Sequence, residues 1–86
     1  MTRFDKVREQ LLSGTSDANI RFDDLCWVLR HLDFQERVRG SHHIFAREGV
    51  AEILNLQARA DGLSKPYQVK QVRDILWKHG LVRGQK

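Results

Sequence analysis

Residues 34–57 read FQERVRGSHHIFAREGVAEILNLQ, and the alternation and turns within them indicate a β-sheet. Phe34 and Val38 fall on the same face of an extended chain, because side chains alternate along a β-strand. Strands are expected over residues 34–39, 42–46 and 50–57, with turns at Gly40-Ser41 and Arg47-Glu48-Gly49. Links this short join antiparallel neighbours, so the stretch predicts a three-stranded antiparallel meander.

Three stretches outside the meander carry apolar residues at helical spacing, over residues 2–13, 22–32 and 66–78. Thr2, with Asp5 three residues later, is typical of a capping box. Pro66 suits the first turn of the last helix, and Gly80 suits a left-handed stop after it. The order α-α-β-β-β-α predicts an α+β fold, with helices on one face of the sheet and the other face open.

The expected core follows the apolar stripes of these helices. The second helix contributes Phe22, Leu25, Cys26, Leu29 and Leu32, and the last contributes Val69, Val72, Leu76 and either Ile75 or Trp77. Trp27 and Trp77 are expected in the core or at its edge rather than as base-stacking platforms, since both lie within helical periods. The polar segment 13–19 is the best candidate for a hinge.

The composition places the chain in one class and excludes others. Its 86 residues allow one domain, with a formal net charge of +4 and one cysteine. Apolar runs are too short for a membrane span, no secretory leader is recognised, and a lone cysteine fits a reducing compartment, so a cytoplasmic location is expected. Residues 1–33 carry five Lys and Arg against six Asp and Glu, whereas residues 34–86 carry ten against five. This basic half favours a polyanionic partner such as RNA, or an acidic protein.

The stretch from Arg37 to Phe45 holds the residues best suited to chemistry. It places two arginines, a turn glycine, a hydroxyl and two imidazoles close together. Histidine can exchange a proton near neutral pH, and arginine can hold a phosphate, so the set suits phosphodiester cleavage without metal. Adjacent strand residues point to opposite faces, so His42 shares a face of the sheet with Ile44, and His43 shares the other face with Phe45. Which of these pairs faces the helices stays open at this level.

Other candidates carry less chemistry. One cysteine and two diverging strand histidines make a poor chelate, so no metal and no cofactor are expected. Cys26 is expected to be a buried small hydrophobe, His31 to be exposed, and His79 to have a structural role at a helix C-terminus. Ser41 fits an ordinary turn residue better than a nucleophile. Lys65, Lys70 and Arg73 surround the start of the last helix, where phosphate is readily bound.

The motif Gly40-Ser41-His42, followed by the aromatic Phe45, resembles the HicA toxin family. Members of this family are ribosome-independent mRNA interferases of bacterial toxin–antitoxin pairs. The resemblance covers residues 22–81 and continues through Asn55-Leu56-Gln57, Lys65-Pro66-Tyr67-Gln68-Val69-Lys70-Gln71-Val72-Arg73 and His79-Gly80-Leu81. It implies a fold like the double-stranded RNA-binding domain, which reads the shape and phosphates of RNA.

The resemblance also implies an activity and a partner. The histidine after Gly-Ser, His42, would be the catalytic residue of a metal-independent endoribonuclease, with His43 as second choice. A HicB-type antitoxin would cover the site, and loss of the antitoxin would stop growth through mRNA cleavage. The contacts to RNA expected from charge and position are Arg37, Arg39, Ser41, Lys65, Lys70 and Arg73, with Gly40 shaping the turn.

Two features fall outside the family pattern. Residues 1–20 form an additional helix and loop in front of a HicA-like domain at residues 21–86, and this helix has three open roles: packing on the core, homodimerisation or antitoxin binding. The chain also shows only one obvious catalytic group, because a lone histidine can act as base or as acid but not as both at once, unless water, His43 or a group of the substrate supplies the other role. A non-catalytic RNA-binding module and a protein-interaction module with the same fold therefore stay as alternatives to the toxin.

Overall fold

The computed structural model describes residues 2–81 and has the predicted order of helices and strands. The elements are α1 (Arg3–Ser13), a 3-10 turn η1 (Asp17–Asn19), α2 (Phe22–His31), β1 (Gln35–Arg39), β2 (His42–Arg47), β3 (Val50–Leu56) and α3 (Pro66–Lys78). The α+β class and the order α-α-β-β-β-α are confirmed. The short turn η1 was not predicted, and it lies in the segment that the sequence favoured as a hinge.

The sheet is an antiparallel meander in the order β1-β2-β3, as predicted. Two-residue turns close both hairpins, since Arg39 pairs with His42 and Arg47 pairs with Val50. The β2–β3 register shifts between Phe45 and Arg47. The shift amounts to two residues on β3, because Phe45 pairs with Leu54, and an even shift leaves every side chain on its original face.

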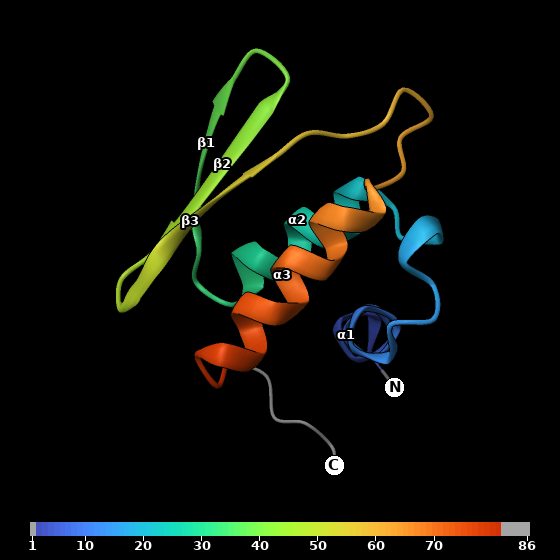
Figure 1. Cartoon of the computed structure of the whole chain (residues 1–86), viewed down its shortest axis with the longest axis horizontal. Coiled ribbons are helices and arrows are strands. Elements are labelled where there is room, and N and C mark those ends of the chain that lie inside the picture. The colour runs from blue at the N-terminus through green and yellow to red at the C-terminus, as the bar shows by residue number, and fades with distance from the viewer. Residues whose placement is uncertain (1, 82–86) are drawn as a thin grey trace.

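The helices cover one face of the sheet in two layers (Figure 1). The helices α2 and α3 lie beside the sheet, and α1 lies beyond them, in contact with both. Of the three roles open to the first helix, packing on the core is the one observed: Val7 and Leu11 of α1 are buried in the main cluster. The opposite face of the sheet is left uncovered by the described helices (Figure 1).

The core agrees with the predicted stripes apart from details in α2 and α3. In α2 the buried side chains are Phe22, Leu25, Cys26, Val28 and Leu29, while Leu32 is partly buried. In α3, Ile75 is 9% exposed and Trp77 is 47% exposed, so Ile75 completes the inner face with Val69, Val72 and Leu76. Trp77 lies at the surface, so the expectation that it would lie in the core or at its edge was wrong.

The helix ends follow the local signals in the sequence. Thr2 and Asp5 form the expected reciprocal capping box at the start of α1. Gly80 adopts a left-handed φ of 64°, and the Leu81 N–H donates to the Leu76 carbonyl at 2.9 Å. This six-to-one hydrogen bond is the Schellman arrangement that the Gly80-Leu81 pair predicted. Pro66 stands in the first turn of α3, also as expected.

The segment between α1 and α2 is held to α3. The Arg73 guanidinium of α3 donates to both carboxylate oxygens of Asp17, at 2.9 and 3.1 Å, and to the Leu11 carbonyl at 3.1 Å. One side chain therefore holds the end of α1 and the turn η1 together. Within residues 2–81, no helix is long and apolar enough to cross a membrane.

Candidate nucleic-acid interface

The two adjacent histidines of β2 lie on opposite faces of the sheet. His43 pairs across the ladder with Leu56, which is buried under the helices, and its ring meets the Phe22 ring edge-on at 5.0 Å. His42 is exposed and lies on the uncovered face. The structure thus decides the question that the sequence left open: His43 and Phe45 face the helices, and His42 and Ile44 face away.

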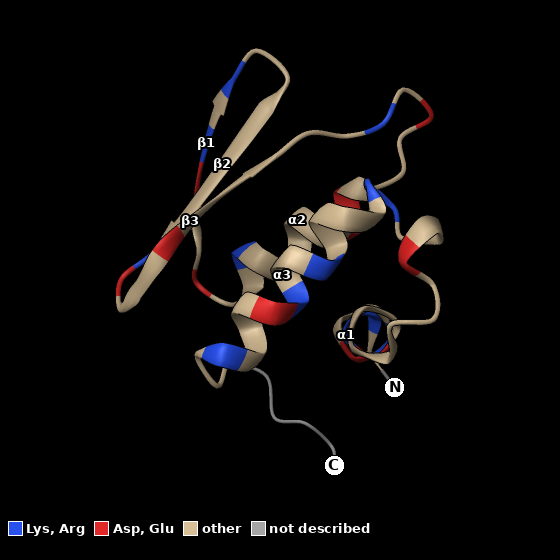
Figure 2. Ribbon diagram, in the orientation of Figure 1, with Lys and Arg blue, Asp and Glu red and all other residues tan. Residues whose placement is uncertain are grey.

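Two arginines of β1 lie on the same uncovered face as His42. Arg39 pairs directly with His42, and Arg37 pairs with Ile44, which in turn pairs with Asn55 of β3. Directly opposed residues of antiparallel strands share a face and are close neighbours. Figure 2 shows basic segments along β1, and Arg39 stands directly before the turn of the β1–β2 hairpin. Neither guanidinium has an ion-pair partner among residues 2–81.

His42 is oriented by an amide of the neighbouring strand. Its Nδ1 lies 3.0 Å from Oδ1 of Asn55. A carbonyl oxygen can only accept a hydrogen bond, so Nδ1 carries the proton in this arrangement. The other ring nitrogen, Nε2, makes no hydrogen bond with any described residue, and in the neutral ring it is the nitrogen that has the free lone pair. The imidazole therefore presents a base to the uncovered side of the sheet.

A chain of polar side chains ties the hairpin tip to the start of α3. Gly40 has a left-handed φ of 59°, which the two-residue turn requires. The Gln57 side-chain amide donates to the Ser41 hydroxyl at 2.7 Å, and the Lys65 ammonium donates to the Gln57 amide oxygen at 3.3 Å. The Gln57 backbone N–H donates to Oε1 of the buried Gln68 at 3.1 Å. Lys65 is thereby held on the Ser41 side of the hairpin.

The remaining residues expected to bind RNA are engaged elsewhere. Lys70 forms an exposed ion pair with Asp74 at 3.0 Å, one turn further along α3. Arg73 is held by Asp17, and this carboxylate raises the pKa of the guanidinium above its ordinary value. Arg39 thus lies opposite His42, and Arg37 lies two residues further along the same face. Lys65 is linked through Gln57 to Ser41, the neighbour of His42 in the chain, whereas Lys70 and Arg73 make none of these contacts. Arg83 and Lys86, which contribute to the basic half, lie outside the described residues.

His43 belongs to a separate polar cluster under the sheet. Its Nδ1 lies 2.6 Å from one oxygen of Glu36, and the Arg30 guanidinium donates to the other oxygen at 2.6 Å. Burial opposes ionisation of Glu36, but the hydrogen bonds from His43 and Arg30 outweigh it and lower the pKa of the carboxyl. Burial also raises the pKa of the nearby Cys26 thiol to about 12.

The cluster contains donor types that metals use. One donor atom each of Cys26, Glu36 and His43 lies within 4.8 Å of the others. In the described structure, however, both carboxylate oxygens of Glu36 are occupied by Arg30 and His43, and the Cys26 thiol is protonated. A cation would have to displace the Arg30 guanidinium and deprotonate a buried thiol, so this arrangement fits a salt-bridged structural cluster.

A third polar group joins β3 to the end of α3. Glu52 accepts from the Lys78 ammonium at 2.5 Å and contacts His79 Nε2 at 2.7 Å. The hydrogen bonds from Lys78 and His79 lower the pKa of Glu52 to about 2. The structural role expected for His79 is consistent with this contact, which holds the helix end against the sheet.

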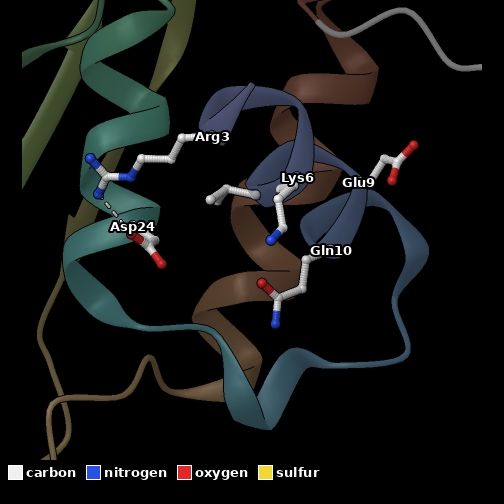
Figure 3. Close-up of a pocket in the computed structure, with 6 residues that line it drawn as sticks. Arg3, Lys6, Glu9, Gln10 and Asp24 are labelled. Atoms are coloured by element: carbon white, nitrogen blue, oxygen red, sulfur yellow. Dashed lines mark hydrogen bonds and ion pairs between the residues drawn. The ribbon is translucent and has the colours of Figure 1, made fainter. Parts of the chain in front are cut away.

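A depression of about 700 Å³ lies between α1 and α2, and neither His42 nor His43 is among its lining residues (Figure 3). Its lining includes Arg3, Lys6, Glu9, Gln10 and Asp24, and Arg3 forms an ion pair with Asp24 at 2.8 Å. The Arg3 guanidinium also lies 4.4 Å from the centre of the Trp27 ring. These charges compensate one another, and no histidine, cysteine or serine lines the depression. It carries no chemistry comparable to the face around His42.

Sequence reasoning missed three partners in these sites. Asn55, Gln57 and Glu36 were read as strand residues with no assigned role, yet each positions a group of interest. For Glu36 a local signal existed, since strand alternation puts it on the face of His43 one ladder step away. For Asn55 the signal was weaker, because its place opposite Ile44 depends on the register shift.

Comparison with family models, with curated proteins and with solved structures finds no match to the chain.

Proposed function

We propose that this protein is an endoribonuclease that cleaves RNA with His42 as its acid–base residue and without metal. The observation that carries the proposal is the position of His42. It is exposed on the uncovered sheet face, opposite Arg39, with Nδ1 held by Asn55 and Nε2 unengaged by the described residues. An imidazole base beside a guanidinium is the pair of groups that metal-free phosphodiester cleavage needs.

The chemistry would use the ribose of the substrate as nucleophile. Nε2 of His42 takes the proton from the 2′-hydroxyl, the 2′-oxygen bonds to phosphorus, and the bond from phosphorus to the 5′-oxygen breaks. The products are a 2′,3′-cyclic phosphate and a 5′-hydroxyl, whose proton comes from water or from the imidazolium. Arg39 and Arg37 would neutralise the charge that develops on the phosphate oxygens.

The wider biological proposal follows the sequence resemblance. A HicA-like toxin with a fold like the double-stranded RNA-binding domain would cleave mRNA independently of the ribosome in the cytoplasm. A HicB-type antitoxin would neutralise it by covering the uncovered sheet face. Support comes from the Gly40-Ser41-His42 turn and from the helix–sheet order that the resemblance implies.

The alternative is an RNA-binding or protein-interaction module with the same surface. The specific observation in its favour is that His43 faces the helices, so that within residues 2–81 no second imidazole accompanies His42 on the uncovered face. In that case Arg37, Arg39 and His42 would contact phosphates without breaking a bond.

The test compares the wild type with His42→Ala on a long single-stranded RNA in EDTA. Gln35→Ala serves as a matched control, because Gln35 is an exposed residue on the same sheet face, at the far end of β1. Cleavage by the wild type and the control, with retained binding and no cleavage by His42→Ala, supports the proposal. Equal cleavage by His42→Ala, or binding without cleavage by the wild type, contradicts it.

A further inference from the structure

We propose that Asn55 is a positioning residue that sets the tautomer of His42. The inference rests on the proposed function and adds a role that the resemblance does not assign. Asn55 lies on β3 opposite Ile44, the residue that follows His42 on the uncovered face of β2. Its amide oxygen lies 3.0 Å from Nδ1 of His42.

The position of Asn55 depends on the irregularity in the sheet. The pairing of Arg47 with Val50, continued without a shift, would place Asn55 directly opposite His42. The shift instead pairs Asn55 with Ile44, so that its side chain meets the histidine diagonally. Diagonal neighbours on one face lie within reach of long or planar side chains. The amide thus approaches the imidazole from the β3 side, while Arg39 is its direct neighbour on β1.

The consequence is a fixed assignment of the two ring nitrogens. The hydrogen bond that one imidazole nitrogen makes determines which nitrogen carries the proton. With Asn55 accepting from Nδ1, the lone pair of neutral His42 lies on Nε2 and points away from the amide. Without this acceptor, the proton can move to Nε2, and the nitrogen that faces the substrate side is then a donor instead of a base.

The charged groups near His42 come from β1 and from the chain of polar side chains that links the hairpin tip to Lys65. Arg37 and Arg39 are the charged residues that share the face of His42 on β1, and on β3 that face presents Ala51, Ile53 and Asn55. Lys65 approaches only through Gln57 and Ser41. Among the described residues, Asn55 is the one whose side-chain oxygen lies within hydrogen-bond distance of Nδ1, so Asn55 is the group that selects the tautomer.

The first readout is spectroscopic and does not depend on activity. Nitrogen-15 NMR of the imidazole, at a pH where His42 is neutral, distinguishes a protonated Nδ1 from a protonated Nε2. We expect a protonated Nδ1 in the wild type and in Asn55→Asp, which keeps an acceptor. In Asn55→Leu, which is similar in size but lacks an acceptor, we expect the proton to move to Nε2. A protonated Nε2 in the wild type would overturn the inference.

The second readout is the pH dependence of RNA cleavage. For Asn55→Leu we expect kcat to fall about tenfold with little change in KM, a part of the roughly 10²–10⁴-fold that general acid–base catalysis supplies. For Asn55→Asp we expect retained cleavage, with the acid limb of the pH–rate profile moved to higher pH, because a carboxylate favours the imidazolium. A purely structural role in the sheet would lower the activity of both variants alike without moving the limb.

The two proposals fail in different ways. A protonated Nδ1 in a wild type that does not cleave RNA overturns the proposed function, and with it the catalytic role of Asn55. Cleavage that depends on His42 but is unchanged in Asn55→Leu overturns the positioning role alone. The control Gln35→Ala, which alters an exposed amide on the same face, is expected to leave both readouts unchanged.

Discussion

At the scale of single residues, the distinction that matters is between two neighbouring imidazoles. His42 and His43 are adjacent in the chain, yet one presents Nε2 to the uncovered face and the other contacts Glu36 and the Phe22 ring under the helices. The same residue type therefore has two environments, separated only by the alternation of a strand. The exposure of His42 beside an arginine suits acid–base chemistry, whereas the contact of His43 with a carboxylate suits a role in stabilising the fold.

His43→Ala is expected to destabilise the fold rather than to remove a catalytic group. The substitution takes a partly exposed hydrogen-bond partner from Glu36 and leaves the carboxylate with Arg30 alone. We expect the free energy of unfolding to fall by about 1 kcal/mol, the usual size of one such hydrogen bond. Urea denaturation measures it, with Gln35→Ala as an exposed control, and an unchanged midpoint would contradict the structural role.

At the scale of elements, local signals predicted most of the fold. The capping box at Thr2, the turn at Gly40-Ser41 and the stop at Gly80 each depend on a few neighbouring residues, and all three are observed. Strand alternation also separated His42 from His43 correctly. It could not say which of them is covered, because Ile44 and Phe45 are both apolar and only the packing of α2 and α3 distinguishes the two faces.

Long-range contacts were beyond local reasoning. Arg73 was expected at a phosphate site, but its partner Asp17 lies 56 residues earlier in the chain. The η1 turn that carries Asp17 has no strong signal of its own in a polar loop. The register shift that brings Asn55 to His42 likewise depends on how β3 packs against its neighbours. These features determine the surroundings of His42, so the sequence predicted that His42 and His43 lie on opposite faces but not which residues contact them.

Arg73 and Lys70 are a matched pair for testing how α1 is attached. The side chain of Arg73 is 15% exposed in its ion pair, and that of Lys70 is 66% exposed. Arg73→Met is expected to lower the free energy of unfolding by about 2 kcal/mol, since it leaves Asp17 and the Leu11 carbonyl without their donor. Lys70→Met is expected to cost at most about 0.5 kcal/mol, as exposed pairs one helical turn apart contribute little. Thermal or urea unfolding measures both changes in free energy. A loss for Arg73→Met no larger than that for Lys70→Met would contradict the role of Arg73 in attaching α1.

The contact of Glu52 with the end of α3 predicts a pH dependence of stability. The folded pKa of about 2 lies below the ordinary value of 4.5, so the stabilisation is fully present above pH 4.5 and is lost as the pH falls toward 2. Glu52→Gln is expected to weaken the dependence of Tm on pH in this window. Glu48→Gln, an exposed residue of the β2–β3 turn, is the control, and the same pH dependence in Glu52→Gln as in the wild type would contradict the assignment.

In the molecule as a whole, the two sides of the sheet differ in how far their charged groups are paired. The helix side holds the buried core and three compensated polar groups, around Arg73, Glu36 and Glu52. The uncovered side presents Arg37 and Arg39 without ion-pair partners among the described residues. The net charge of +4 therefore matters less than where uncompensated charge is exposed.

This asymmetry predicts how RNA affinity depends on salt. Each arginine that neutralises a phosphate of a single strand contributes about 0.7 to the slope of log affinity against log salt. Arg37→Ala and Arg39→Ala are each expected to reduce the slope by about this amount. Arg59→Ala removes a loop arginine that is paired with Asp61 and is expected to leave the slope unchanged. Fluorescence anisotropy at several salt concentrations provides the measurement, and equal slopes for all three variants would argue against RNA binding at this face.

The most direct test of the central claim compares the two histidines side by side. Wild type, His42→Ala and His43→Ala are incubated with RNA in EDTA at a temperature below the unfolding midpoint of each protein. The cleavage rate is then expressed per folded molecule. We expect His42→Ala to be inactive and well folded, whereas His43→Ala is less stable but still cleaves. Cleavage by His42→Ala, or loss of cleavage in a well-folded His43→Ala, would contradict the assignment of the catalytic face.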